Sequence, residues 1–432
     1  MTEAPHASPT PTRWSVLLPL SGSALLASAT GGMSGDLFNL FLTGELGFSP
    51  AVLSVIYAGM LLSLPLQLAG PTIARRFRFH TLMTAGAVVS AAAVVAILLV
   101  VHLPVGDRLQ LTVVIVAAVL VEIAFSLSYG TVWSAWLGEV CRDEDRPTVL
   151  SLGKLLSQGT LVACFTLQAV VFNGDVTTTL YTSVCVWVLV YLAGSVVVYL
   201  ALPDPGIPDS TDAGLSPRGV VRGTLHDLAV TLRTPAYRLI LVCESCQFFI
   251  GVPLLSVYLM QVIGVPSQTV GFVLIARTVG SMVFMLFLGP LTRRFGARSV
   301  LCISGGVSTA ALVPWLLVPV PGSALHTVWT WLPVVLVPVL FAAKSVFSTS
   351  VDSIAYDLVP REDRVVVFTV SDVVSSGSLQ LTGMLGAWLV ATSSDGPSLV
   401  TGGVGVVAAS TWILAGVVVS VVLTVRFSRA AR

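Results

Sequence analysis

Ionisable side chains lie inside several of the longest apolar stretches of this 432-residue chain. An ionised side chain at the centre of a bilayer costs about 2.5–3.5 kcal/mol on insertion scales, so such residues are expected to face one another or water. A carboxyl group in this setting can bind a proton at one side of a membrane and release it at the other, whereas arginine keeps its charge. The residues are Asp36, Glu122, Lys154, Glu244, Arg277, Lys344 and Asp372.

Polar and aromatic residues repeat at helical spacing beside these charges. Glu122, Ser126, Tyr129 and Trp133 step by four, three and four residues, which places them on one face of a helix. Such a face is either a packing seam held by hydrogen bonds or the wall of an aqueous path, and the charges favour the path. The residues predicted to line it are Asp36, Asn39, Glu122, Tyr129, Trp133, Glu244, Gln247, Arg277 and Lys344.

The charges also suggest pairs and proton carriers. Lys154 and Lys344 are the only lysines in the chain. Lys344 and Asp372 fall at similar depths in their apolar runs, and we expect them to form an ion pair. Arg277 is expected to anchor an anionic group or to pair with Asp36 or Glu122. Proton coupling or ion pairing is predicted for Asp36, Glu122, Lys154, Glu244, Lys344 and Asp372.

Several function classes lack their motifs. The sequence has no H-E-x-x-H, G-x-S-x-G or Walker glycine loop, so we expect no enzymatic activity and no ATP-driven pumping. Cys243 and Cys246 form an isolated C-x-x-C without a second pair, and the histidines fall in tails, loops or span ends. We therefore predict no metal and no cofactor, with a proton gradient as the energy source. A net charge of +1 gives no indication of nucleic-acid binding.

Composition places the chain in lipid. Hydrophobic residues make up 55% and charged residues 10% of the sequence, where soluble chains carry about 25% charged residues. Apolar runs of helical length predict twelve membrane-spanning helices and a multi-pass protein of the cytoplasmic membrane. The runs cover 14–42, 50–70, 81–103, 111–138, 148–172, 179–201, 237–262, 268–290, 299–319, 328–355, 365–393 and 405–425.

The polar segment 202–236 divides six spans from six. The predicted parts are a disordered tail (1–13), an N-terminal bundle (14–201), a cytoplasmic linker (202–236), a C-terminal bundle (237–425) and a basic cytoplasmic tail (426–432). With both termini inside, eighteen of the 22 lysines and arginines fall in inner segments, and only Arg108 falls outside. This asymmetry follows the positive-inside rule and supports an even number of spans.

The two halves repeat one another. The run Gly70-Pro71-Thr72-Ile73-Ala74-Arg75-Arg76 recurs 219 residues later as Gly289-Pro290-Leu291-Thr292-Arg293-Arg294, and Glu144-Asp145-Arg146 recurs as Glu362-Asp363-Arg364. Six spans separate the copies, so the halves share one orientation and form a parallel repeat. Each Gly-Pro pair is interpreted as a short turn that fixes two helices at the inner face.

Over essentially its whole length the chain resembles the major facilitator superfamily. The resemblance rests on the topology, the duplication and a partial match to the signature Gly-x-x-x-Asp-x-x-Gly-Arg-[Lys/Arg], in which Ala74 and Phe77 replace the aspartate and the second glycine. It implies two six-helix bundles, with the uncharged spans 3, 6, 9 and 12 at the periphery. It also implies cytoplasmic gate loops formed by Gly70, Arg75, Arg76, Arg78, Gly289, Arg293, Arg294 and Gly296.

These observations indicate a secondary transporter. Aromatic residues beside carboxylates suit an amphiphilic organic molecule, and we expect proton-coupled export, by antiport, of a drug-like or natural-product solute. The alternatives are proton-coupled uptake of a sugar, organic acid or siderophore-like nutrient, or lipid flipping. We expect a monomer whose partners are membrane lipids and the small solute.

Overall fold

The computed structural model describes residues 35–74, 77–133, 146–201, 225–226, 228–250, 255–257, 259–260, 264–312, 326–360 and 363–394. Within these ranges all regular elements are helices and none is a strand. Most of the predicted first span, the whole of the twelfth, most of the linker and both tails lie outside the described residues.

The N-terminal half contains the end of the first predicted span and the next five spans. The second span begins sharply because Pro50 occupies the first helical turn and the Ser49 hydroxyl accepts a hydrogen bond from the Ala51 backbone nitrogen. The elements are α2 (Asp36–Leu40) with η2 (Phe41–Glu45), α3 (Pro50–Met60), α4 (Ser63–Ala74), α5 (Phe79–His102), α6 (Asp107–Phe125) with η3 (Ser126–Trp133), α8 (Arg146–Thr166) with η4 (Leu167–Val171), and α9 (Thr178–Ala201).

The described part of the C-terminal half contains the next five predicted spans. Its elements are α11 (Pro235–Ile250), α12 (Leu255–Val257), α13 (Ser267–Phe295), α14 (Ala297–Leu312), α15 (His326–Leu358) and α16 (Arg364–Ser394). Helix α11 starts at Pro235, two residues inside the segment predicted as linker.

Two predicted turns are wrong. Gly70 and Pro71 lie inside α4, and Pro290 lies inside α13, which continues to Phe295. Membrane helices tolerate such prolines because neighbouring helices and local adjustments satisfy the freed backbone groups. The second copy instead turns at Gly296, whose positive φ of 79° suits glycine and separates α13 from α14.

In the described N-terminal half, the helices α2, α6 and α8 end in wider, π-helical segments, η2, η3 and η4. The rings of Phe125, Tyr129 and Trp133 stack in sequence, with centroids 5.1 Å and 6.1 Å apart, so Tyr129 and Trp133 share one face as their four-residue spacing predicts. π-Helical turns inside α-helices are frequent at functional sites.

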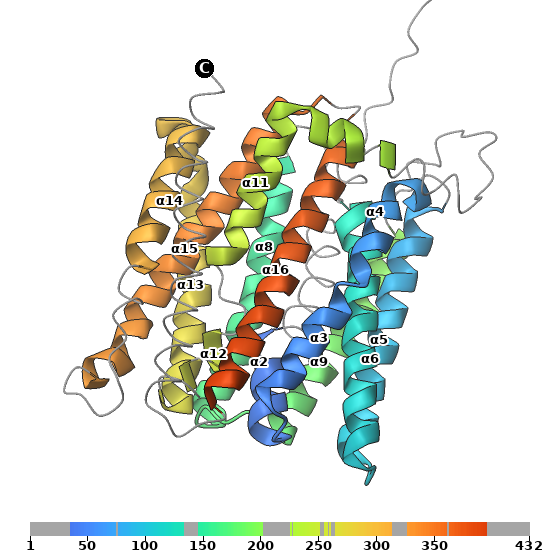
Figure 1. Cartoon of the computed structure of the whole chain (residues 1–432), viewed down its shortest axis with the longest axis vertical. Coiled ribbons are helices and arrows are strands. Elements are labelled where there is room, and N and C mark those ends of the chain that lie inside the picture. Colours follow the sequence, from blue (N-terminus) through green and yellow to red (C-terminus); the bar gives the residue numbers. More distant parts are fainter. Residues whose placement is uncertain are drawn as a thin grey trace, which may run out of the picture.

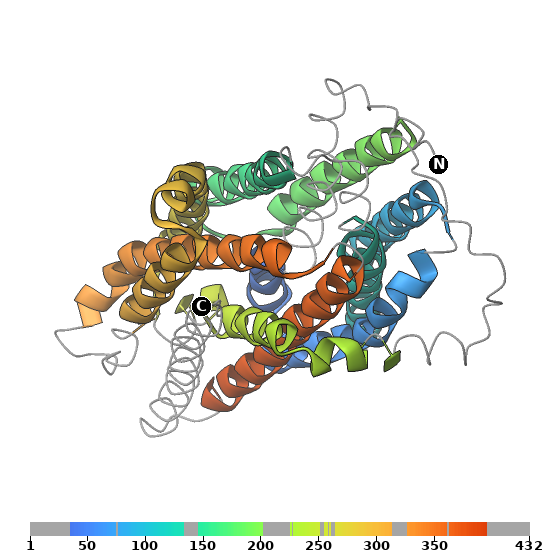
Figure 2. The same ribbon diagram turned by 90° about the horizontal axis from the view of Figure 1, so that it is seen from above.

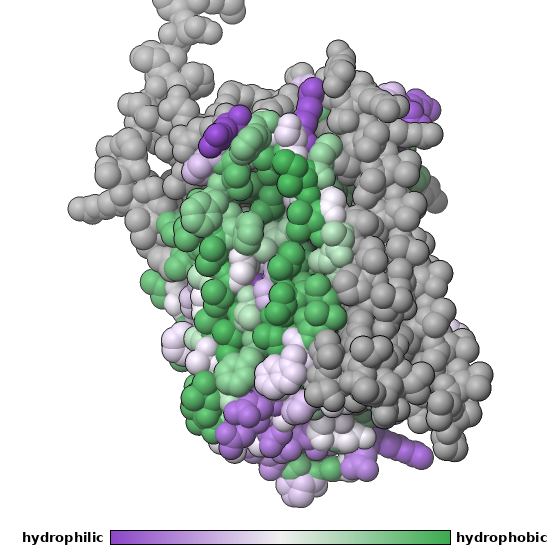
Figure 3. All heavy atoms as spheres, turned by 90° about the vertical axis from the view of Figure 1, so that its left-hand side faces the viewer, coloured by the Kyte–Doolittle hydropathy of each residue, from purple (hydrophilic) through white to green (hydrophobic). Residues whose placement is uncertain are grey.

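The helices have the length and surface of membrane spans. Within the described residues, six helical segments are long and apolar enough to cross a bilayer. They are Pro50–Gly70, His80–His102, Asp107–Tyr129, Thr178–Ala201, Ser267–Leu288 and Trp331–Asp352. Figure 3 shows one face of the molecule, where hydrophobic residues cover the middle and hydrophilic residues gather at both ends. This distribution is that of a surface embedded in lipid.

The two halves contact each other along two lines (Figures 1 and 2). Helix α16 packs against α3 and α4, and α13 packs against α8 and η4. Glycine permits the close approach of α16, since a Cβ added to Gly383 would lie 2.7 Å from the ring of Tyr57. Charged residues of one half are thereby brought beside residues of the other.

Candidate functional site

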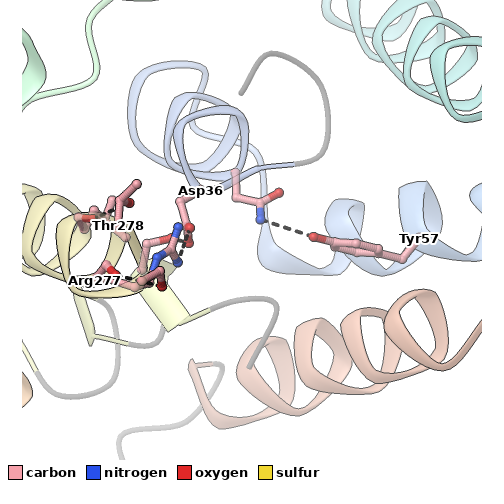
Figure 4. A network of polar contacts seen from close by, with 8 residues as sticks. Asp36, Tyr57, Arg277 and Thr278 are labelled. Carbon is pink, nitrogen blue, oxygen red and sulfur yellow. Dashed lines mark hydrogen bonds and ion pairs between the residues drawn. The ribbon is translucent and has the colours of Figure 1, made fainter. Parts of the chain in front are cut away.

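An ion pair joins the two halves. Arg277, in the first half of α13, places Nη1 2.6 Å from Oδ2 of Asp36, the first residue of α2. The Ser256 hydroxyl of α12 donates a hydrogen bond to Oδ1 of the same carboxylate (2.7 Å). The side chains of Arg277 and Asp36 are only 14% and 10% exposed. Figure 4 shows Asp36 directed toward Arg277, so a carboxylate of the N-terminal half is held by two C-terminal residues.

Aromatic rings from both halves hold the guanidinium of Arg277. Its Cζ lies 4.7 Å from the ring centroid of Phe341 on α15 and 5.7 Å from that of Phe165 on α8. Such contacts favour a cation through the electron-rich ring face. Asp36 and Glu122 were the two residues predicted as partners of Arg277, and in the structure Arg277 pairs with Asp36.

Lys344 shares the Phe341 ring with Arg277. Its Nζ lies 5.6 Å from the ring centroid, and electrostatic interactions link it to Arg277 and Glu244. Glu244, on α11, is buried (8% exposed). Asp36, Arg277, Lys344 and Glu244 therefore belong to one group of opposite charges at the interface. The predicted pairing of Lys344 with Asp372 stays a prediction.

A second polar contact crosses the halves through Glu122. Nε2 of Gln380, on α16, donates a hydrogen bond to Oε1 of Glu122 on α6 (2.8 Å). Gln380 was missed from the sequence because a neutral amide in an apolar helix carries no charge signal. It is buried, with 2% of its surface exposed.

Asn39 contributes a contact inside the N-terminal half. Its Nδ2 donates to the hydroxyl of Tyr57 (3.3 Å), whose ring packs against Gly383 of the other half. Asn39 follows Asp36 by one helical turn on α2, so the two residues connect the ion pair to Tyr57 (Figure 4).

The halves also touch at one end of the molecule. Hydrogen bonds gather the turns there: Glu45 accepts from Thr178, His102 contacts Thr182, and Ser267 donates to Asp175 (3.0 Å). We call this the outer end, since the charge distribution predicts these turns to be outside. Gly174 has φ +89°, and an added Cβ would collide with the backbone of Ser267 and Gln268. This contact could not be predicted from the sequence.

For the remaining predicted residues the structure gives the burial of some and leaves others outside its described part. Gly70 is buried within α4, whereas Arg78, Arg294 and Gly296 are exposed, and Asp372 is half-buried on α16. Arg75 and Arg76 lie outside the described residues, as do the side-chain surroundings of Lys154, Gln247, Gly289 and Arg293. In the part of the chain that the structure describes, no three His, Cys, Asp or Glu residues are grouped to hold a metal ion.

Comparison of the sequence with known families gives one partial match. Residues 237–428 match the sequence profile of the Major Facilitator Superfamily. No curated protein sequence matches the chain. The C-terminal half of the chain is therefore similar in sequence to the major facilitator superfamily.

Solved structures share the fold at low sequence identity. A bacterial homologue of the iron transporter ferroportin in an outward-facing state is 16% identical, with a TM-score of 0.65 over 96% of this chain and 99% of that one. The nucleoside transporter NupG is 14% identical, with a TM-score of 0.60 over 96% and 98%. A D-xylose-proton symporter is also 14% identical, with a TM-score of 0.64 over 93% and 97%.

Proposed function

We propose that this chain is a proton-coupled secondary transporter that exports a small organic solute, drug-like or a natural product, by alternating access. The observation that carries the proposal is the ion pair between Asp36 and Arg277, which joins the halves about midway along the membrane span Ser267–Leu288. In alternating access the halves must part on one side while they close on the other. A charge pair across the interface is a contact that such a movement has to break and reform.

Proton binding at Asp36 gives the movement a driving force. Two unit charges 4 Å apart attract by about 4 kcal/mol at an effective dielectric constant of 20, and neutralising one of them removes this attraction. Arg277 can only donate hydrogen bonds, so a protonated Asp36 is a poor partner for it. A proton entering from outside would thus weaken the contact and favour the state that is open to the outside.

Arg277 also offers a site for the solute. One carboxylate oxygen engages its Nη1, while a guanidinium carries five N–H donors, and the rings of Phe165 and Phe341 border it. A polar or anionic group of the solute could take the place of Asp36, while its apolar part packs on the rings. Proton binding at Asp36 and solute binding at Arg277 would then each break the same ion pair, so that one event makes the other easier.

Uptake by proton symport is the second candidate. One of the proteins with this fold is a D-xylose-proton symporter, and a protonatable carboxylate at the interface serves either direction. The geometry of the ion pair is the same for both, so direction has to be measured.

Flux measurements test the proposal. A growth-protection panel with a deletion strain first selects candidate solutes. The flux of each solute is then measured with the purified protein in proteoliposomes, once with a pH gradient and once without it. We expect a solute flux that depends on the gradient and is lost in Asp36→Asn, while Glu45→Gln, which removes a carboxylate bonded within one half, retains it. Flux that persists unchanged when the proton gradient is collapsed would reject proton coupling, and movement of lipid alone would indicate a flippase.

A further inference from the structure

The amide of Gln380 has one bonded end and one unbonded end. Its Nε2 donates to Glu122, whereas its Oε1 is buried and has no hydrogen-bond partner among the described residues. Leaving a buried acceptor unsatisfied costs about 1–3 kcal/mol. A side chain that bridges the two halves in this way calls for a physical reason.

The chemistry of an amide supplies one. A primary amide carries a donor and an acceptor on the same carbon, and a half-turn of the group exchanges their positions. An ionised carboxylate only accepts hydrogen bonds, whereas a protonated carboxyl group also donates one. Gln380 can therefore bond Glu122 in both forms, through Nε2 to the carboxylate and through Oε1 to the protonated acid.

We propose that Gln380 is a positioning residue that keeps Glu122 hydrogen-bonded, and α6 joined to α16, in both protonation states of Glu122. The inference rests on the proposed function, because it requires that Glu122 exchange a proton. It separates two kinds of contact between the halves. The contact of Asp36 with Arg277 weakens on protonation, whereas the contact of Glu122 with Gln380 persists through it.

The surroundings of Glu122 fit this role. Tyr57 of α3 interacts electrostatically with both Glu122 and Asp36, Tyr129 lies on η3, and Asp372 lies two turns before Gln380 on α16. Helices α3, α4 and η3 contain no lysine or arginine, and α5 carries only His80 and His102 near its ends. Arg364, the first residue of α16, lies more than four turns from Gln380. An amide is thus the group that these helices offer to Glu122.

Helix α16 presents Gln380 to the N-terminal half. Gly383 follows it by one turn and packs against Tyr57, and Gly377 precedes it by one turn, where an added Cβ would lie 3.1 Å from Leu64. The two glycines place Gln380 on the face of α16 that meets α3 and α4.

Infrared difference spectroscopy of the full protein in lipid, recorded on lowering the pH, tests the inference. The carbonyl band of protonated Glu122 is assigned as the band that disappears in the Glu122→Gln variant. We expect this band to move to higher frequency in Gln380→Met, because the acid loses its acceptor. Gln168→Met is the matched control, since Gln168 is also buried and bonds the backbone of Gly174, and we expect no change there.

A second measurement needs no substitution at Gln380. In protein labelled with carbon-13 glutamine, we expect one side-chain carbonyl band to shift to lower frequency on acidification, and the shift to be absent in Glu122→Gln. A Glu122 acid band without this shift would overturn the inference, as would the absence of that band at every pH at which the protein stays folded. Proton-dependent flux could still hold in either case through Asp36, so the two proposals fail separately.

Discussion

Removing the charge of Asp36 is the perturbation that the structure predicts most sharply. Asp36→Asn keeps the size of the side chain and an acceptor for Ser256, but it leaves Arg277 without its counter-ion. Both groups are mostly buried, at 10% and 14% exposure. Breaking a buried pair by removing one partner costs about 3–5 kcal/mol, and the remaining exposure favours the lower end.

This cost applies to the state in which the outer end is closed. When the halves part, Arg277 can be hydrated and the missing carboxylate matters little. A loss of about 3 kcal/mol shifts the balance between closed and open by roughly a hundredfold, since 1.4 kcal/mol corresponds to a factor of ten. We therefore expect the closed state to lose most of its population in Asp36→Asn.

Crosslinking across the outer end measures that population. Cysteines are introduced at Asp175 and Ser267, which bond each other at 3.0 Å, in a background without the native cysteines, and are joined by a short thiol-specific crosslinker. We expect rapid crosslinking in the parent and a strong decrease in rate with Asp36→Asn. Glu45→Gln serves as the control, because Glu45 bonds Thr178 within the same half.

A double variant separates charge from packing. Arg277→Gln combined with Asp36→Asn removes both charges, so we expect it to recover much of the crosslinking rate that the single change loses. An unchanged rate in Asp36→Asn, or effects of the two substitutions that simply add, would show that the ion pair does not hold the outer end closed.

Three further predictions concern neighbouring positions. Gly383→Ala places a Cβ 2.7 Å from the Tyr57 ring and should lower stability by about 1–3 kcal/mol, seen as a lower Tm, whereas Gly306→Ala, which meets no atom within 4 Å, should not. Gly174→Ala should slow the crosslinking across the outer end. An L-residue at positive φ costs about 1–2 kcal/mol, and the added Cβ would meet the backbone of Ser267 and Gln268. Gly194→Ala, which meets no atom within 4 Å, is its control. Arg277→Lys keeps the charge but loses the planar group against Phe341, so solute flux should fall about tenfold, a loss of about 1.4 kcal/mol; an unaltered flux would rule out a role for the guanidinium plane.

The positions of the helices could be predicted because lipid sets their length. The sixth apolar run, predicted at 179–201, is the helix α9 (Thr178–Ala201), and the tenth, predicted at 328–355, lies within α15 (His326–Leu358). The Gly-Pro turns failed for the same reason. In water such a pair ends a helix, but in a bilayer the backbone gains more from remaining helical.

The partners of the charges could be predicted only as alternatives. Arg277 had three possible partners by sequence, and the docking of α2 against α12 and α13 decided for Asp36. Gln380 could not be found, since its role depends on the side-chain register of α16 against α6. The π-helical form of η3 was hidden as well, because the sequence pattern does not mark where an α-helix widens into a π-helix.

A distance measurement between the halves shows directly whether proton binding releases the outer end. Spin labels at Asp107 and Gln268, exposed positions on opposite halves at that end, report the separation by pulsed electron resonance in lipid nanodiscs. In the parent protein we predict a short distance between the labels at neutral pH and a longer distance at acid pH. In Asp36→Asn we predict the longer distance at both pH values. Distances that are independent of pH and identical in the two proteins would show that protonation of Asp36 does not open the outer end.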